Sequence, residues 1–168
     1  GIDIVTSDPI VVYRESVEKE SPVLIGKSPN KHNHLFVKVE PMSDKLFDAI
    51  NSGDIVETKV RKKNLKEMTA ALVDAGMERD VAKKVKEIFN GCIFVDATRG
   101  IVYINEIISL VLEAFREAVK GGPLSREPCG KLIIKLTDAK LHEDSIHRGP
   151  AQIIPAMRNS IYNAMLTA

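Results

Sequence analysis

The sequence predicts an α+β fold, a four-stranded sheet with helices packed on one face, from two kinds of periodicity and their order. Short runs rich in β-branched and apolar residues are typical of strands, and they occupy residues 9–17, 35–41, 92–96 and 131–139. Segments with apolar residues at intervals of three and four are typical of helices, and they occupy residues 43–53, 64–77, 78–89, 104–122 and about 151–168. Because the two kinds of segment interleave along the chain, helices are expected to cover a sheet.

Local signals mark the ends of these elements in chain order. The first strand is followed by a turn-rich loop over residues 20–34, which contains proline and glycine. Ser43 fits the N-cap of the helix after the second strand, and Gly53 is a stop signal for that helix. A glycine pair beginning at Gly121 ends the clearest helix. Pro155 is expected in the first turn of the last helix, where proline removes no helical hydrogen bond.

Composition indicates one globular domain over residues 1–168, cut from a longer protein, with a short linker expected over residues 1–8. Apolar residues make up 44% and charged residues 28% of the chain, and the net charge is +1. A near-neutral chain has no overall attraction to nucleic acid, so any such contact must be local. Cys92 and Cys129 are interpreted as reduced thiols of a cytoplasmic protein. No apolar run approaches the roughly 18 residues of a membrane span, and a monomer without membrane contact is expected.

One loop between predicted strands contains no carboxylate from residue 26 to residue 39. Its cationic or titratable side chains are Lys27, Lys31, His32, His34 and Lys38. Asn30 and Asn33 add amide donors, so the loop suits contact with phosphates and sugar hydroxyls. A solvated hairpin tip explains the same composition equally well. A second basic run, residues 59–66, is interpreted as a solvated helix entrance.

The segment "LHEDSIHRGPAQIIP", residues 141–155, gathers two histidines, two acids and an arginine. A zinc hydrolase needs two histidines one helical turn apart, with the motif H-E-x-x-H. His142 and His147 are five positions apart, which places them on different faces of a helix or a strand. No third ligand is evident in the sequence. A metallohydrolase using His142, Glu143 and His147 therefore remains only a rival hypothesis.

The end of the same segment suits an anionic partner. Gly149 and Pro150 lead into the last helix, so free backbone N–H groups and the positive end of the helix dipole lie beside His147 and Arg148. An ordinary capped helix with an exposed histidine has the same pattern. The Gly-Lys pair before Leu132 lacks the other residues of a phosphate-binding loop, and no catalytic serine or cysteine signature is present.

Taken together, several stretches resemble translation elongation factor 2 of the archaeal and eukaryotic type, specifically its fourth domain. The stretches are "DPIVVYRESV", "GKSPNKHNHLFVKVEP", "GIVYINEI" and "LHEDSIHRGPAQIIPAMRNSIY", and the compact form resembles archaeal members. The resemblance implies a five-domain GTPase that drives ribosomal translocation and binds GTP and Mg²⁺ in its first domain. This fragment is then expected to hold no cofactor or metal and to be no enzyme. The family's fourth domain has a left-handed β-α-β crossover, against the usual handedness, and its tip enters the A site of the small subunit.

The resemblance also assigns roles to residues. His147 matches the histidine that the family converts to diphthamide, the target of ADP-ribosylation by diphtheria-type toxins. The tip expected to contact RNA and the ribosome comprises Ser28, Pro29, Asn30, Lys31, His32, Asn33, Arg148, Gly149 and Gln152. The residues expected to support the loop are His142, Glu143 and Asp144. Implied partners are the ribosome with its small-subunit rRNA, tRNA and mRNA, the diphthamide biosynthesis enzymes and the toxins.

One sequence difference and one alternative assignment bear on this resemblance. Pro150 and Ala151 stand where the eukaryotic motif has glycines, which predicts a stiffer loop. The alternative assignment is the corresponding domain of a related GTPase that acts on other RNA assemblies. The motif "IHRGPAQ" argues against it, because such relatives are expected to lack a histidine loop suited to modification.

Overall fold

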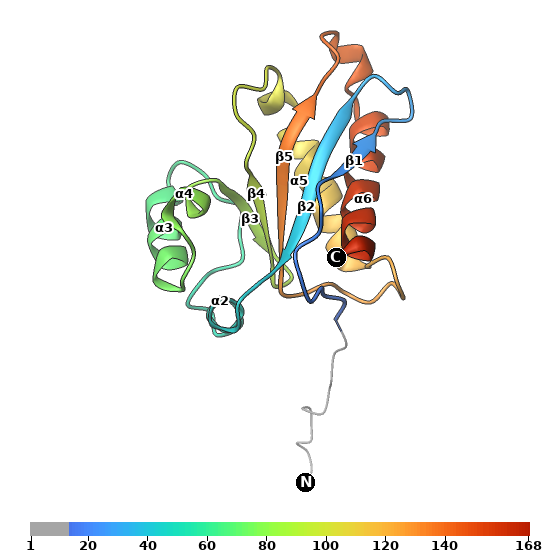
Figure 1. Ribbon diagram of the computed structural model, residues 1–168. Coiled ribbons are helices and arrows are strands. Elements are labelled where there is room, and N and C mark those ends of the chain that lie inside the picture. Colours follow the sequence, from blue (N-terminus) through green and yellow to red (C-terminus); the bar gives the residue numbers. More distant parts are fainter. Residues whose placement is uncertain (1–13) are drawn as a thin grey trace.

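The computed structural model describes residues 14–168, which form one five-stranded sheet flanked by helices (Figure 1). The strands are β1 (Leu24–Lys27), β2 (His34–Pro41), β3 (Val85–Phe89), β4 (Cys92–Asp96) and β5 (Leu132–Lys140), in the spatial order β1-β2-β5-β4-β3. The helices are α2 (Asp44–Asn51), α3 (Leu65–Asp74), α4 (Arg79–Ala82), α5 (Ile104–Lys120), the short 3₁₀ helix η1 (Ser145–His147) and α6 (Pro150–Thr167).

The sheet is mixed, and one pair of strands is parallel. β2 pairs antiparallel with β1 and with β5, and β3 pairs antiparallel with β4. β4 and β5 are parallel neighbours joined through α5. In Figure 1 both strands run upward, β5 lies to the right of β4, and α5 lies behind the sheet. The crossover is therefore left-handed, the rare hand for this connection.

The larger hydrophobic core lies between the sheet and the two long helices. Alternate residues of β2 and β5 point toward α5 and α6, including Leu35, Val37, Ile134 and Leu136, each with no exposed surface. This alternation is the pattern of a sheet with one face against helices. Helix α5 places its apolar stripe on the same core, as its spacing predicts, and Phe115 of that stripe is fully buried.

The smaller core lies on the opposite face, so the prediction that helices cover one face holds only for α5 and α6. In β4 the side chains alternate between the two cores. Phe94 points into the larger core, whereas Ile93 and Val95 belong to the smaller core together with Leu46 of α2 and Leu72 of α3. A strand buried on both faces needs apolar residues at successive positions, which "CIFVD" provides.

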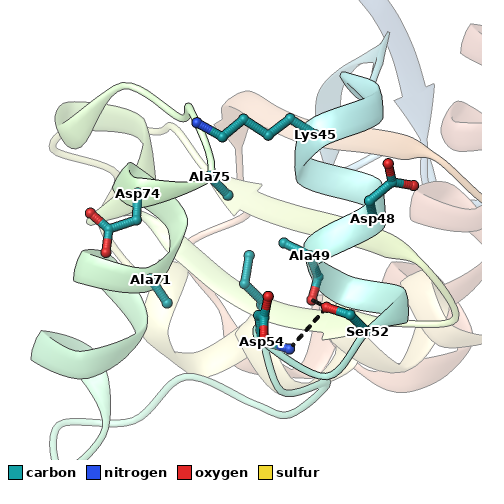
Figure 2. Close-up of a pocket in the computed structure, with 9 residues that line it drawn as sticks. Lys45, Asp48, Ala49, Ser52, Asp54, Ala71, Asp74 and Ala75 are labelled. Atoms are coloured by element: carbon teal, nitrogen blue, oxygen red, sulfur yellow. Dashed lines mark hydrogen bonds between the residues drawn. The ribbon is translucent and has the colours of Figure 1, made fainter.

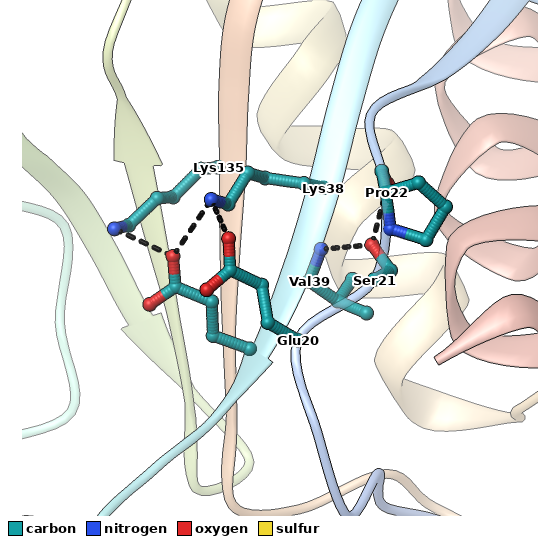
Figure 3. A network of polar contacts seen from close by, with 7 residues as sticks. Glu20, Ser21, Pro22, Lys38, Val39 and Lys135 are labelled. Atoms are coloured by element: carbon teal, nitrogen blue, oxygen red, sulfur yellow. Dashed lines mark hydrogen bonds and ion pairs between the residues drawn. The ribbon is translucent and has the colours of Figure 1, made fainter.

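The second face also carries a network of charged side chains over β2 and β5 (Figure 3). Lys38 forms ion pairs with Glu20 and with Glu40, and Lys135 lies 2.8 Å from Glu40. The carboxylate of Glu20 raises the pKa of Lys38, and Lys38 in turn lowers the pKa of Glu20. Acidic and basic side chains thus neighbour one another in this network, and their charged groups keep this part of the sheet in contact with solvent.

Three sequence predictions are corrected by the fold. Residues 24–27, assigned to a loop, form the edge strand β1, and residues 85–89, assigned to a helix, form β3. Three of the four predicted strands correspond to β2, β4 and β5, and with β1 and β3 the described sheet has five strands and not four. Pro155 lies in the second turn of α6 and not in the first. The strand predicted over residues 9–17 and the linker predicted over residues 1–8 fall wholly or largely outside the described residues.

Helix α6 packs closely on the edge strand at Gly26. A Cβ atom added to Gly26 would lie 2.3 Å from the backbone oxygen of Ala156 and 2.8 Å from Cβ of Ser160. No side chain fits at that distance. Glycine at this position therefore lets α6 lie directly on β1.

Candidate functional site

Three loops meet at one end of the sheet, and we call this end the tip. They are residues 28–33 between β1 and β2, residues 97–103 after β4, and residues 141–149 after β5, which we call the histidine loop. The parallel strands β4 and β5 both finish at this end of the sheet, and β2, which is antiparallel to β5, begins there. Figure 1 shows the loop after β5 at the top, between the other two. The topology thus brings together segments more than 100 positions apart in sequence.

The loop of residues 28–33 is held by its own hydrogen bonds. The backbone N–H of Asn33 donates to Oγ of Ser28 at 3.0 Å, and the N–H of Ser28 donates to the Asn33 carbonyl at 3.0 Å. The Ser28 hydroxyl donates to Oδ1 of Asn30 at 2.5 Å. Lys31 adopts a left-handed conformation with φ of 65° at the turn. Ser28 and Asn33 are consequently buried, and Lys31 and His32 are left exposed.

Asparagine side chains join this loop to the loop of residues 141–149. The amide groups of Asn33 and Asn30 both donate to the carbonyl of His147, at 2.7 and 3.1 Å. Oδ1 of Asn33 accepts from the N–H of His142 at 3.0 Å, and Oε1 of Gln152 accepts from the N–H of Asn30 at 2.8 Å. The backbone of His147 is therefore held in place by Asn30 and Asn33 of the other loop.

Three histidine rings lie in mutual contact at the tip. The ring centroids of His142 and His147 are 4.4 Å apart, and His32 lies 4.9 and 4.7 Å from them. Nδ1 of His142 accepts a hydrogen bond from the N–H of Asp144 at 2.9 Å, and Oδ1 of Asp144 accepts from the N–H of Ile146. His142 and Asp144 thus support the loop by local hydrogen bonds. Across residues 14–168 no three histidine, cysteine or acidic side chains are placed to hold a metal ion.

Arg148 is buried, with 6% of its surface exposed, and does not lie on the surface of the tip. Its guanidinium lies 4.1 Å from the centre of the Tyr103 ring, a cation–π contact. Nη1 lies 3.6 Å from a carboxylate oxygen of Glu106 on α5. Nε and Nη1 have no hydrogen-bond partner in the described chain. Arg148 therefore fastens the histidine loop to the start of α5, a role that differs from the RNA contact predicted for it.

Exposure at the tip differs along the histidine loop. Ile146 is 77% exposed, whereas His147 is half-buried against the other two histidine rings. Pro29 and Glu143 are exposed, and Gly149 and Gln152 are half-buried. His147 is therefore half-buried and not a fully exposed loop apex. Its ring lies against that of the exposed His32, and the neighbouring Ile146 is exposed as well.

Replacing Tyr103 with leucine is expected to lower stability by about 2 kcal/mol, because the cation–π contact of a desolvated arginine is lost. The histidine loop should loosen at the same time. Chemical denaturation measures the first effect, and hydrogen exchange of the amides of residues 145–149 measures the second. Tyr103→Phe keeps a ring under the guanidinium and is the matched control. Equal losses in the two variants would show that the ring does not hold Arg148.

A cleft of about 810 Å³ lies between α2 and α3, away from the tip (Figure 2). Lys45 and Asp48 line one side and Asp74 lines the other, with Asp54 between them and alanine side chains at the wall. None of the site residues predicted from the sequence lies in it. The cleft is therefore separate from the arrangement at the tip.

The two cysteines are free and buried inside the domain. Burial raises the pKa of the Cys129 thiol to about 12 and also raises the pKa of Cys92. Both groups stay protonated near neutral pH, so neither is poised as a nucleophile. Within the described residues, no helix is long and apolar enough to cross a membrane.

The family model described as "Elongation factor G, domain IV" matches residues 53–168. The chain belongs to this domain IV family. The match covers the parallel β4–α5–β5 unit and the histidine loop but begins after the loop of residues 28–33. Domain IV of a translation elongation factor is thus the fold on which the tip is built.

Archaeal relatives of this domain IV extend the likeness to the loop of residues 28–33. Elongation factor 2 of Pyrococcus furiosus is 49% identical over 168 residues, and that of Pyrococcus horikoshii is 49% identical over 166 residues. Elongation factor 2 of Thermococcus gammatolerans is 50% identical over 167 residues. These alignments cover 99–100% of the chain but only 22–23% of the relatives. The chain spans less than a quarter of the proteins it matches.

Proposed function

We propose that this domain is the ribosome-engaging probe of a GTP-dependent translocation factor, and that its tip contacts RNA in the A site of the small subunit. The observation that supports this most is the joining of two loops, distant in sequence, around the backbone of His147. The exposed Lys31 and His32 lie beside it. A cationic surface on a rigid tip suits the phosphates and sugars of a codon–anticodon duplex, which has to be recognised by shape and not by sequence.

The charge distribution supports a local contact. The chain has a net charge of +1, so its attraction to RNA is confined to loops such as residues 28–33. A strongly basic domain would bind ribosomal RNA at many places, since phosphate neutralisation is insensitive to sequence. A near-neutral domain with a cationic tip directs binding to one end. That is the property expected of a probe which enters and leaves a binding site in each cycle.

We further infer that His147 is the diphthamide position of this chain. Its carbonyl is fixed by Asn30 and Asn33, so the ring is presented at a defined place on the tip. The biosynthetic enzymes, and toxins that transfer ADP-ribose from NAD, would act on that ring. In this role His147 is a substrate and not a catalyst. As the family resemblance implies, GTP and Mg²⁺ would bind to another domain of the whole factor. The fragment itself would then have no enzymatic activity.

The rival metallohydrolase would use His142, Glu143 and His147. Glu143 has no hydrogen bond to either histidine in the described chain, and Nδ1 of His142 already accepts the N–H of Asp144. The histidine rings instead pack on one another and on His32. The contacts therefore favour a recognition surface. A related GTPase acting on other RNA assemblies is the remaining alternative, and the Elongation factor 2 relatives favour the translocation factor.

In the full-length factor, Lys31→Ala is expected to slow translocation by a factor of about ten to a hundred. A charge-assisted hydrogen bond to phosphate contributes about 1.5–3 kcal/mol, and 1.36 kcal/mol corresponds to a factor of ten in rate. Single-turnover movement of mRNA on pre-translocation ribosomes measures the rate, and nucleotide binding off the ribosome should be unchanged. Lys45→Ala, an exposed lysine on α2 away from the tip, is the matched control. Translocation at the unsubstituted rate in Lys31→Ala would count against the proposed function.

A further inference from the structure

The loop of residues 97–103 belongs to the tip, although the site predicted from the sequence did not include it. The stretch "GIVYINEI", which resembles the family, covers only its second half. Its first residue is held to the sheet, because the N–H of Ala97 donates to the Leu136 carbonyl at 2.9 Å. Its last residue, Tyr103, lies under the guanidinium of Arg148. The loop is therefore attached at both ends to the strand and the loop that present His147.

The conformation of this loop is fixed by local contacts. Oδ1 of Asp96 accepts hydrogen bonds from the N–H of Thr98 at 3.0 Å and from its hydroxyl at 2.6 Å. Gly100 and Tyr103 both adopt left-handed backbone conformations, with φ of 62° and 74°. A turn capped at its start and fastened at its end presents the intervening side chains at defined positions. Arg99 lies between these two fixed points.

Arg99 is exposed, and no ion pair or hydrogen bond of its side chain is found within residues 14–168. The loop from residue 97 to residue 103 contains no carboxylate, as in the loop of residues 28–33. Arg148, the other arginine at this end of the molecule, is buried under Tyr103 and cannot reach a partner outside the domain without leaving that contact. Arg99 is thus the arginine of the tip that is free to bind an anion.

We propose that Arg99 is a second phosphate-binding cation of the tip, contacting RNA backbone on the side of the histidine loop opposite Lys31. Figure 1 shows residues 97–103 and residues 28–33 on the two sides of the loop that contains His147. Guanidinium groups bind phosphate through two parallel N–H donors. Two cations separated by the histidine loop would fix the orientation of the tip on RNA, whereas Lys31 alone would leave it free to pivot.

This inference rests on the proposed function, and one binding series tests both. The full-length factor carrying Arg99→Ala, Lys31→Ala or both changes is bound to ribosomes at a series of KCl concentrations. Affinity falls as salt rises, and each lost phosphate contact reduces the magnitude of the slope of log K against log salt by about one. We expect Arg99→Ala and Lys31→Ala each to reduce this magnitude by about one, and the double variant by about two. Arg99→Lys should restore most of the slope.

Arg79→Ala is the matched control, since Arg79 is an exposed arginine on α4, against the other face of the sheet. It should leave affinity and slope unchanged. A reduced magnitude of the salt slope for Lys31→Ala with an unchanged slope for Arg99→Ala would overturn the inference and leave the proposed function standing. Unchanged slopes for both variants would overturn the proposed function and the inference with it. Thermal unfolding should not distinguish Arg99→Ala from the parent chain, because the side chain has no partner to lose.

Discussion

Replacing His147 with alanine is expected to abolish the transfer of ADP-ribose by diphtheria toxin. Transfer forms a bond between the ribose of ADP-ribose and the modified imidazole, with nicotinamide leaving, so without the ring no acceptor atom remains. The measurement is incorporation of label from radioactive NAD into protein made in the native source, where the proposed modification of His147 would take place. One ADP-ribose per chain is expected for the parent sequence and none for His147→Ala. Protein made in a bacterial host that lacks the modifying enzymes should also accept none.

The other two rings of the histidine cluster provide the controls. His32→Ala and His142→Ala remove rings 4.7 and 4.4 Å from His147 but leave the acceptor in place. Both variants should still be labelled, although more slowly where the packing of the His147 ring is disturbed. Label that persists in His147→Ala, or moves to His32 or His142, would refute the assignment of the diphthamide position.

Replacing Gly26 with alanine is expected to lower the free energy of unfolding by about 3 kcal/mol. The new Cβ would lie 2.3 Å from the Ala156 oxygen, and overpacking of this kind costs about 1–3 kcal/mol in folded cores. Backbone atoms cannot turn away as a flexible side chain can, which places the cost at the upper end. For a domain of this size the midpoint of thermal unfolding should fall by about 10 °C. Calorimetry or circular dichroism measures the shift.

The same substitution should disturb the tip, because α6 cannot move away from β1 without moving its first turn. Gln152 in that turn accepts the N–H of Asn30, so this bond between α6 and the loop of residues 28–33 would weaken. Gly149→Ala is the matched control, since a Cβ at that position meets no atom within 4 Å. Because glycine is preferred over alanine at an N-cap, this change costs about 0.5–1 kcal/mol, well below the cost expected for Gly26→Ala. Equal thermal midpoints for the two variants would contradict the packing argument.

Local sequence patterns correctly predicted the helices and strands whose structure follows from the residues within the segment. Helix α5 has an apolar stripe that fits only a helix against a core, and β4 and β5 were predicted close to their observed bounds. The segment predicted as a helix, residues 78–89, has apolar residues at Val81, Val85, Ile88 and Phe89, a spacing that fits a helix although the last three lie in β3. Pairing with β4 decides in favour of a strand. That decision depends on tertiary contacts, which local periodicity does not contain.

β1 was missed for a related reason. Its segment is bounded by Pro22 and Pro29 and contains Gly26, all of which are signals for a turn. In the structure Gly26 serves the close approach of α6. Glycine suits both purposes, and only the position of α6, more than 120 residues later in the chain, distinguishes them.

The residues of the site were predictable to the extent that they lie in recognisable motifs. Both loops containing the predicted residues do meet, and Asn33 and Asn30 contact the backbone of His147. The burial of Arg148 was not predictable, because Tyr103 is 45 positions away and no local pattern pairs its ring with Arg148. The loop of residues 97–103 was missed for the same reason. Its place at the tip follows from the parallel pairing of β4 with β5.

The length of β5 gives the domain the properties of a lever. The strand has nine residues, about 30 Å at 3.3 Å per residue, and α6 returns over a similar distance. Arg14 contacts the turn between β3 and β4, and Ala168 ends α6, both at the end of the sheet remote from the tip. A tilt of about 10° at that end displaces a point about 30 Å away by about 5 Å. A small rotation at the end remote from the tip therefore moves His147 by more than the length of a hydrogen bond. Such a displacement is enough to make or break all contacts of the tip with a partner at once.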